Sequence, residues 1–103
     1  MIYNKLVRDR IPEIIESNGG KAEIRKLSHA EYLHFLEEKL NEEVGEYHRD
    51  KTVEELADIL EVVYALATAN GCTREDLQHI YQQKHHERGG FEKRVFLISS
   101  EKP

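Results

Sequence analysis

A long amphipathic segment that ends at a polar break constrains this fold more than any other feature of the sequence. The segment begins at Ser28, which is expected to form a capping box with Glu31. An apolar stripe follows at steps of three and four residues, made of Leu33, Leu36, Leu40, Val44 and Tyr47. The polar stretch "HRDKT" (48–52) then interrupts the stripe. This pattern predicts one long helix with a buried face.

A second helix is expected directly after the break. Thr52 and Glu55 form a second capping-box pattern, and Gly71 provides a stop after about Asn70. Because only a short polar break separates the two helices, we expect them to fold back on one another. The sequence therefore predicts a central antiparallel helical hairpin.

Shorter elements are expected on either side of the hairpin. Residues 8–18 suit a short helix with Asp9 as candidate N-cap. Thr73 with Asp76 is expected to cap a further helix that ends near residues 89–90.

Two stretches read as strands rather than helices. "KAEIRKL" (21–27) and "KRVFLIS" (93–99) are expected to pair as a small two-stranded β element. No linker or internal repeat divides the chain, so we expect a single, mainly α domain over residues 1–103.

The second helix contains a segment that is apolar on all sides. In "ILEVVYALATA" (59–69), Glu61 is the only charge. Such a helix must be buried all round, either by other elements of the same chain or by a second copy. For a chain of 103 residues we favour the second copy, which predicts a homodimer or a higher oligomer.

Composition excludes several broad functions. The formal net charge of −5, with 20 acidic residues against 15 Lys and Arg, disfavours nucleic-acid binding. No apolar run reaches the length of a membrane span, and the N-terminus lacks the apolar stretch of a signal peptide. The single cysteine, Cys72, cannot form an intramolecular disulfide. Together these features predict a cytoplasmic protein without a membrane partner.

Acidic residues flank the turn of the predicted hairpin in a matched pattern. On the first helix Glu43 and Glu46 lie three positions apart, as Glu55 and Asp58 do on the second. Folding the helices antiparallel about the polar break places Glu46 level with Glu55, and Glu43 level with Asp58. The four carboxylates should therefore meet beside the apolar stripes.

Carboxylates that are clustered and partly buried either take up protons or bind a cation. Oxygen ligands suit Mg²⁺, with Mn²⁺ as a substitute, and bound Mg²⁺ is usually completed by substrate phosphates. Glu42 lies next to the cluster and can hold or deprotonate a water, and Glu61 can extend the site. The alternative is a solvated acidic face that binds no metal.

The acidic motif and three further stretches of the sequence resemble one enzyme family. "EEVGE" (42–46) followed by "ELAD" (55–58) is similar to the E-E-x-x-E…E-x-x-D motif of the MazG-like all-α nucleoside triphosphate pyrophosphatases. The flanking stretches "YNKLVRDRIPEII" (3–15), "ADILEVVYAL" (57–66) and "KHHERGGFEKRVFL" (84–97) resemble a small single-domain branch of that family, called phosphoribosyl-ATP pyrophosphohydrolase-like.

The resemblance implies a house-cleaning hydrolase that cleaves the α–β phosphoanhydride of a nucleoside triphosphate, giving a monophosphate and pyrophosphate. It implies Mg²⁺ ligation by the four acids of the hairpin, with Glu42 orienting the attacking water. Two alternatives stay open: phosphoribosyl-ATP hydrolysis in histidine biosynthesis, and a non-catalytic helical dimerisation module. Cations for the substrate phosphates are expected from Lys84 and Arg88 first, and then from Lys5 and Arg8.

Overall fold

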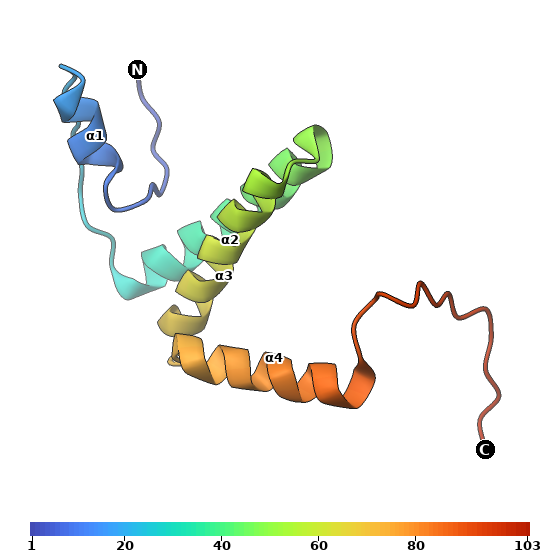
Figure 1. Ribbon diagram of the computed structural model, residues 1–103. Coiled ribbons are helices and arrows are strands. Elements are labelled where there is room, and N and C mark those ends of the chain that lie inside the picture. Colours follow the sequence, from blue (N-terminus) through green and yellow to red (C-terminus); the bar gives the residue numbers. More distant parts are fainter.

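The computed structural model describes residues 1–103 and is all-helical (Figure 1). It contains no strand, and its four helices are α1 (Ile11–Ser17), α2 (His29–Asp50), α3 (Val53–Ala69) and α4 (Arg74–Arg88). The prediction of a mainly α fold is confirmed. None of these helices combines the length and apolar character that a membrane crossing requires.

The starts of the long helices follow their capping residues. The Ser28 side chain accepts a hydrogen bond from the Glu31 backbone N–H, and Glu31 accepts one from the Ser28 N–H in return. Thr73 and Asp76 form the same reciprocal box at the start of α4. These side chains satisfy backbone donors that have no partner within the helix. These two predicted capping boxes are confirmed.

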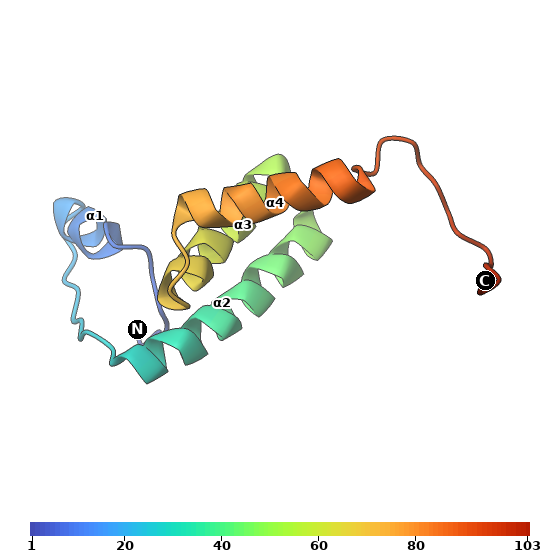
Figure 2. The same cartoon turned by 90° about the horizontal axis from the view of Figure 1, so that it is seen from below.

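α2 and α3 form the predicted hairpin and lie side by side along their length (Figures 1 and 2). Lys51 adopts the left-handed conformation, with φ of 58°, and its N–H donates to the Tyr47 carbonyl at 2.8 Å. This cap ends α2 and reverses the chain. Between the helices, Leu36 of α2 and Val62 of α3 are buried and form the core.

The start of α1 differs from the prediction. Its N-cap is Arg10, with no side-chain capping bond, rather than Asp9. Because α1 begins at Ile11, Asp9 lies one residue too early to reach the free backbone N–H groups. Its carboxylate is therefore not used by the helix.

The predicted two-stranded β element is wrong. Residues 21–27 lead into α2, whereas residues 93–99 belong to the extended C-terminal segment beyond α4, and the two lie on opposite sides of the molecule in both views (Figures 1 and 2). β-branched and aromatic residues favour strands only where a partner strand is within reach. Neither stretch has such a partner in this chain.

α4 is joined to α3 by one polar contact region and contacts no other helix. The Arg74 guanidinium lies 3.9 Å from the centre of the Tyr64 ring, and Gln78 donates a hydrogen bond to the Tyr64 hydroxyl at 3.2 Å. Beyond this region α4 projects away from the hairpin (Figure 1). One face of α3 is consequently left open.

Candidate metal centre

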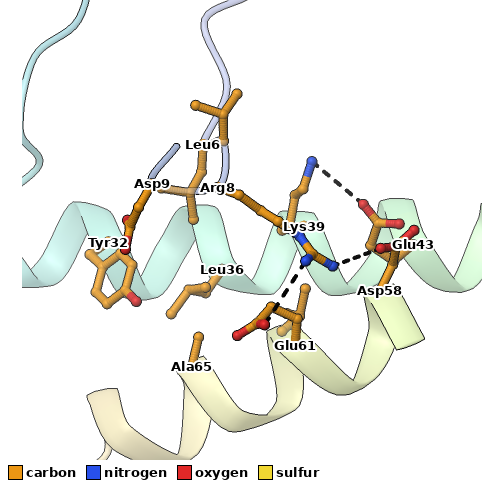
Figure 3. Close-up of a pocket in the computed structure, with 12 residues that line it drawn as sticks. Leu6, Arg8, Asp9, Tyr32, Leu36, Lys39, Glu43, Asp58, Glu61 and Ala65 are labelled. Atoms are coloured by element: carbon orange, nitrogen blue, oxygen red, sulfur yellow. Dashed lines mark hydrogen bonds and ion pairs between the residues drawn. The ribbon is translucent and has the colours of Figure 1, made fainter. Parts of the chain in front are cut away.

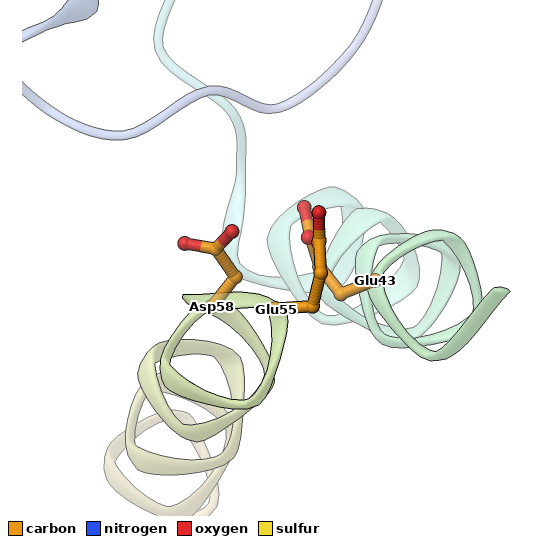
Figure 4. Close-up of side chains that lie close together, drawn as sticks. All are labelled: Glu43, Glu55 and Asp58. Carbon is orange, nitrogen blue, oxygen red and sulfur yellow. The ribbon is translucent and has the colours of Figure 1, made fainter. Parts of the chain in front are cut away.

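Three carboxylates meet where α2 and α3 pack together (Figure 4). Glu43 comes from α2, and Glu55 and Asp58 come from one face of α3, because residues three apart are neighbours on a helix. One oxygen from each residue lies within 4.8 Å of the others. The hairpin therefore brings together three of the four acids expected from the sequence.

The fourth predicted acid, Glu46, lies beside this group rather than within it. Burial raises the pKa of Glu43 above its usual value, and hydrogen bonding and repulsion from Glu46 raise it further. Burial is also the main cause that raises the pKa of Glu55, followed by repulsion from Glu46, Asp50 and Asp58. Glu46 thus influences both carboxylates, although it lies outside the group of three whose oxygens are within 4.8 Å of one another.

The buried oxygens of the group are those that a cation would satisfy. Glu43 is among the few buried residues of the chain, with 7% of its surface exposed. Its Oε2 atom and that of Glu55 are both buried and have no hydrogen-bond partner. A buried acceptor without a partner is costly, and the cost is greater for a charged one. Two such oxygens from facing helices suit a hard divalent ion.

Glu55 also explains why the second predicted capping box is only half formed. Thr52 accepts a hydrogen bond from the Glu55 backbone N–H at 3.4 Å, as expected. The Glu55 carboxylate, however, lies with Glu43 and Asp58 instead of returning to the Thr52 N–H. The reciprocal half of that prediction is wrong, because one side chain cannot occupy both places.

Two cations from the N-terminal segment, Lys5 and Arg8, reach the acidic site, and Figure 3 shows Arg8 there. Arg8 Nη2 lies 2.7 Å from Asp58 Oδ1, and Arg8 Nη1 lies 4.0 Å from Glu61 Oε1. Lys5 Nζ lies 3.5 Å from Glu42 Oε1. The structure therefore places Lys5 and Arg8, two of the predicted phosphate-binding residues, at the edge of the carboxylate group.

Lys39 is a site residue that the sequence reasoning missed. Its Nζ lies 3.4 Å from Glu42 Oε2 and 3.5 Å from Glu43 Oε1, and the side chain is largely buried. The signal was its spacing, because a lysine three and four positions before two glutamates faces both on a helix. Lys39 partly balances the charge of Glu43, whereas Glu55 has no cation of its own.

Lys84 and Arg88, by contrast, are not brought to the acidic group. Both are exposed on the half of α4 that projects away from the hairpin, and neither lines the cavity beside the carboxylates. Their proposed role in phosphate binding stays a prediction.

Comparison with known proteins adds one partial relative. An uncharacterized protein of Mycolicibacterium smegmatis (strain ATCC 700084 / mc(2)155) is 55% identical to this chain over 42 residues. The matched region covers 41% of this chain and 43% of that protein, so the chain spans less than half of its relative's length. No family model matches the chain. No solved structure matches it either. What the site does is therefore inferred from its own residues.

Proposed function

We propose that this protein is a cytoplasmic, Mg²⁺-dependent nucleotide pyrophosphohydrolase of the MazG-like kind, which cleaves a nucleoside triphosphate to its monophosphate and pyrophosphate. The observation that carries the proposal is the group of Glu43, Glu55 and Asp58, with two buried oxygens that lack partners. Cationic side chains stand directly beside this group. An acidic metal site flanked by cations suits a substrate rich in phosphate oxygens.

Glu43, Glu55 and Asp58 would hold the metal, with Glu46 next to them and Glu61 one turn beyond Asp58. Mg²⁺ is the preferred ion and Mn²⁺ its substitute, because every ligand offered is a carboxylate oxygen. The chemistry that such an ion would supply is neutralisation of charge on the phosphate oxygens of the substrate.

The other charged residues of the site have separate roles in the proposed hydrolysis. Glu42 is held between Lys5 and Lys39, and its carboxylate accepts a proton from the attacking water. The water oxygen forms a new bond to the α-phosphorus while the α–β phosphoanhydride bond breaks. Pyrophosphate leaves with the electron pair of that bond. Arg8 lies at the edge of the carboxylate group, where its guanidinium would contact a substrate phosphate.

A homodimer is part of the proposal. The radius of gyration of one chain is 18.3 Å, whereas a compact chain of this length has about 13 Å. On α3, the side chains of Leu56 and Leu60 are 46% and 49% exposed on the face that no other helix covers. A second copy packed there would bury this apolar surface, as it must be in a stable protein.

Pyrophosphate release from a panel of nucleotides tests the activity. The purified protein is incubated with Mg²⁺ and the common and damaged nucleoside triphosphates, with phosphoribosyl-ATP in a parallel reaction. We expect hydrolysis of at least one triphosphate, and loss of that activity with EDTA and in Glu55→Gln. The matched control Glu54→Gln, one residue away and outside the carboxylate group, should keep full activity.

The outcomes separate the alternatives. If phosphoribosyl-ATP is the only nucleotide hydrolysed, the protein is the phosphoribosyl-ATP pyrophosphohydrolase of histidine biosynthesis. Hydrolysis that persists equally in EDTA and in Glu55→Gln would remove the basis for a metal site. A protein that hydrolyses nothing in the panel but forms a stable dimer would be a helical dimerisation module.

A further inference from the structure

A cavity of about 300 Å³ opens directly from the acidic group (Figure 3). The N-terminal segment covers one side of it, and α2 and α3 form the other sides. Six of the twelve residues that line it are hydrophobic, and the other six are charged. Its volume lies at the lower end of the range of small-molecule sites, about 300–1,000 Å³.

The lining changes in character along the cavity. Glu43 and Asp58 lie at one end, where the metal and phosphates are proposed to bind (Figure 3). Leu6, Leu36 and Ala65 form an apolar middle section. Tyr32 of α2 and Asp9 of the N-terminal segment also line the cavity, away from Glu43 and Asp58 in this view (Figure 3).

Asp9 is free to contact a ligand in the cavity. It does not cap α1, whose N-cap is Arg10. Its backbone is anchored next to α1, because the carbonyl of the preceding residue, Arg8, accepts a hydrogen bond from the Ile11 N–H at 3.0 Å. The carboxylate therefore lines the cavity without a role in the helix.

We propose that the cavity binds the nucleoside part of the substrate and that Asp9 selects guanine. This inference rests on the proposed nucleotide hydrolysis. The flat base fits against Leu36 and Ala65 and beside the Tyr32 ring, since base faces are apolar and stack on aromatic side chains. The Asp9 carboxylate offers two acceptors and no donor.

Guanine is the common base whose edge matches a carboxylate. It presents two adjacent donors, the ring N1–H and the 2-amino group. Adenine and cytosine present one amino donor beside a ring acceptor, and uracil presents one N–H between two carbonyls. Hypoxanthine has the N1–H but lacks the 2-amino group. Each of these leaves an acceptor of Asp9 unpaired or facing another acceptor, which lowers affinity.

Selectivity among triphosphates tests the inference in the full-length protein. We expect kcat/KM for GTP to exceed that for inosine triphosphate and ATP by about ten- to a hundredfold, the effect of one or two hydrogen bonds to a charged group. In Asp9→Asn the amide can accept from an amino group and donate to a ring nitrogen. That variant should therefore shift the preference from GTP toward ATP. The control Glu16→Gln, on α1 and outside the cavity, should keep the wild-type preference.

Binding of guanosine monophosphate with Mg²⁺, measured by calorimetry, gives a second readout that does not depend on turnover. Wild type should bind it at least tenfold more tightly than inosine monophosphate, and Asp9→Asn should lose this difference. Equal values for guanine and hypoxanthine nucleotides in wild type, in either assay, would overturn the role of Asp9 while leaving the hydrolase proposal standing. If the protein binds guanosine monophosphate selectively but hydrolyses no nucleotide, the hydrolase proposal is overturned and the role of Asp9 in selecting guanine stands.

Discussion

Asp58 has a cationic partner in the structure, although we propose that it binds a metal ion. Arg8 lies 2.7 Å from it, but both side chains are about half exposed, and exposed ion pairs of this kind contribute little to stability. A divalent ion can therefore replace Arg8 at Asp58 with little loss. The guanidinium released in this way stays next to the site.

The stability of the protein should depend on Mg²⁺ through this residue. An ion that binds only the folded state stabilises it by about 2.7 kcal/mol at a hundredfold excess over Kd. We expect a higher Tm for wild type in Mg²⁺ than in EDTA, and little or no such difference for Asp58→Asn. In EDTA the variant should melt at the wild-type Tm or slightly above it, because one source of repulsion is gone.

Glu54→Gln is the matched control for this thermal comparison, because Glu54 is an exposed acid of the same helix outside the carboxylate group. It should keep the full response to Mg²⁺. An ion-independent Tm in wild type would contradict the metal site.

Glu31 should control part of the acid sensitivity of the fold. The hydrogen bond from Arg25, followed by that from the Ser28 backbone, lowers the pKa of Glu31 from 4.5 to about 2. Because the pKa is lower in the folded state, the stability that Glu31 adds is present above the unfolded pKa and is lost as the pH falls toward about 2.

Urea denaturation from neutral to acid pH measures this contribution. Glu31→Gln should be less stable than wild type at neutral pH, and the difference should shrink as the pH falls below about 4.5. Glu16→Gln, an exposed change on α1, should show no such trend. A constant difference at every pH would mean that the charge of Glu31 is not involved.

At the level of elements, the sequence predicted the structure correctly where interactions between residues close in the chain determine it. Ser28 and Thr73 each satisfy backbone donors of their own helix, so their positions specify where α2 and α4 start. The apolar stripe that contains Leu36 likewise specified which face of α2 is buried. The hairpin and three carboxylates of the site followed from these local rules.

The failures arose where distant residues decide the outcome. Residues 21–27 and 93–99 have strand-forming composition, but a strand also requires a partner, and the chain holds them apart. Glu55 could have completed a capping box, yet tertiary packing brought its carboxylate to Glu43. The cavity lined by Asp9 and Tyr32 could not be foreseen, because it depends on where the N-terminal segment packs against the hairpin.

Gly45 is the weakest position of α2 by helix propensity. It lies inside the helix, five residues before Asp50 ends it, and a Cβ built there meets no atom within 4 Å. Gly45→Ala should therefore raise the free energy of unfolding by about 1 kcal/mol. Urea denaturation measures this change, and Ala57→Gly, on an exposed position of α3, should give an opposite change of similar size.

Activity assays on Gly45→Ala test whether the glycine has a role in catalysis. If Gly45→Ala is more stable and equally active, the glycine has no role in catalysis. If it is more stable but inactive, the space above Gly45 must admit a substrate or a second chain.

On the scale of the whole molecule, the single chain leaves an unusually large surface in contact with water. Its accessible surface is 9574 Å², whereas a folded monomer of 12.1 kDa exposes about 6,000 Å². Only Leu36, Val62 and Glu43 are buried. A core of this size is too small for a stable monomer, which favours assembly with a second copy.

Charges placed on the open face of α3 should prevent that assembly. The double change Leu56→Glu and Leu60→Glu alters side chains that are about half exposed in one chain, so it removes little of that chain's own core. We expect sedimentation velocity to show a dimer for wild type at micromolar concentration and a monomer, or a poorly folded chain, for the variant.

Gln82→Glu adds a negative charge at an exposed polar position of α4 and should leave the dimer intact. A wild type that sediments as a well-folded monomer would contradict the proposed assembly.

The N-terminal segment crosses the cavity and is fastened mainly by exposed ion pairs through Lys5 and Arg8, helped by the half-buried Leu6 and Val7. Dissolved salt weakens such pairs, since the screening length falls from about 10 Å at 0.1 M to about 3 Å at 1 M. Amide hydrogen exchange of residues 5–10 should therefore accelerate with added sodium chloride, while exchange around Leu36 stays slow. If exchange is unchanged, the two apolar side chains suffice to hold the segment. If it accelerates, the ionic strength of the surroundings determines how long the cavity stays covered.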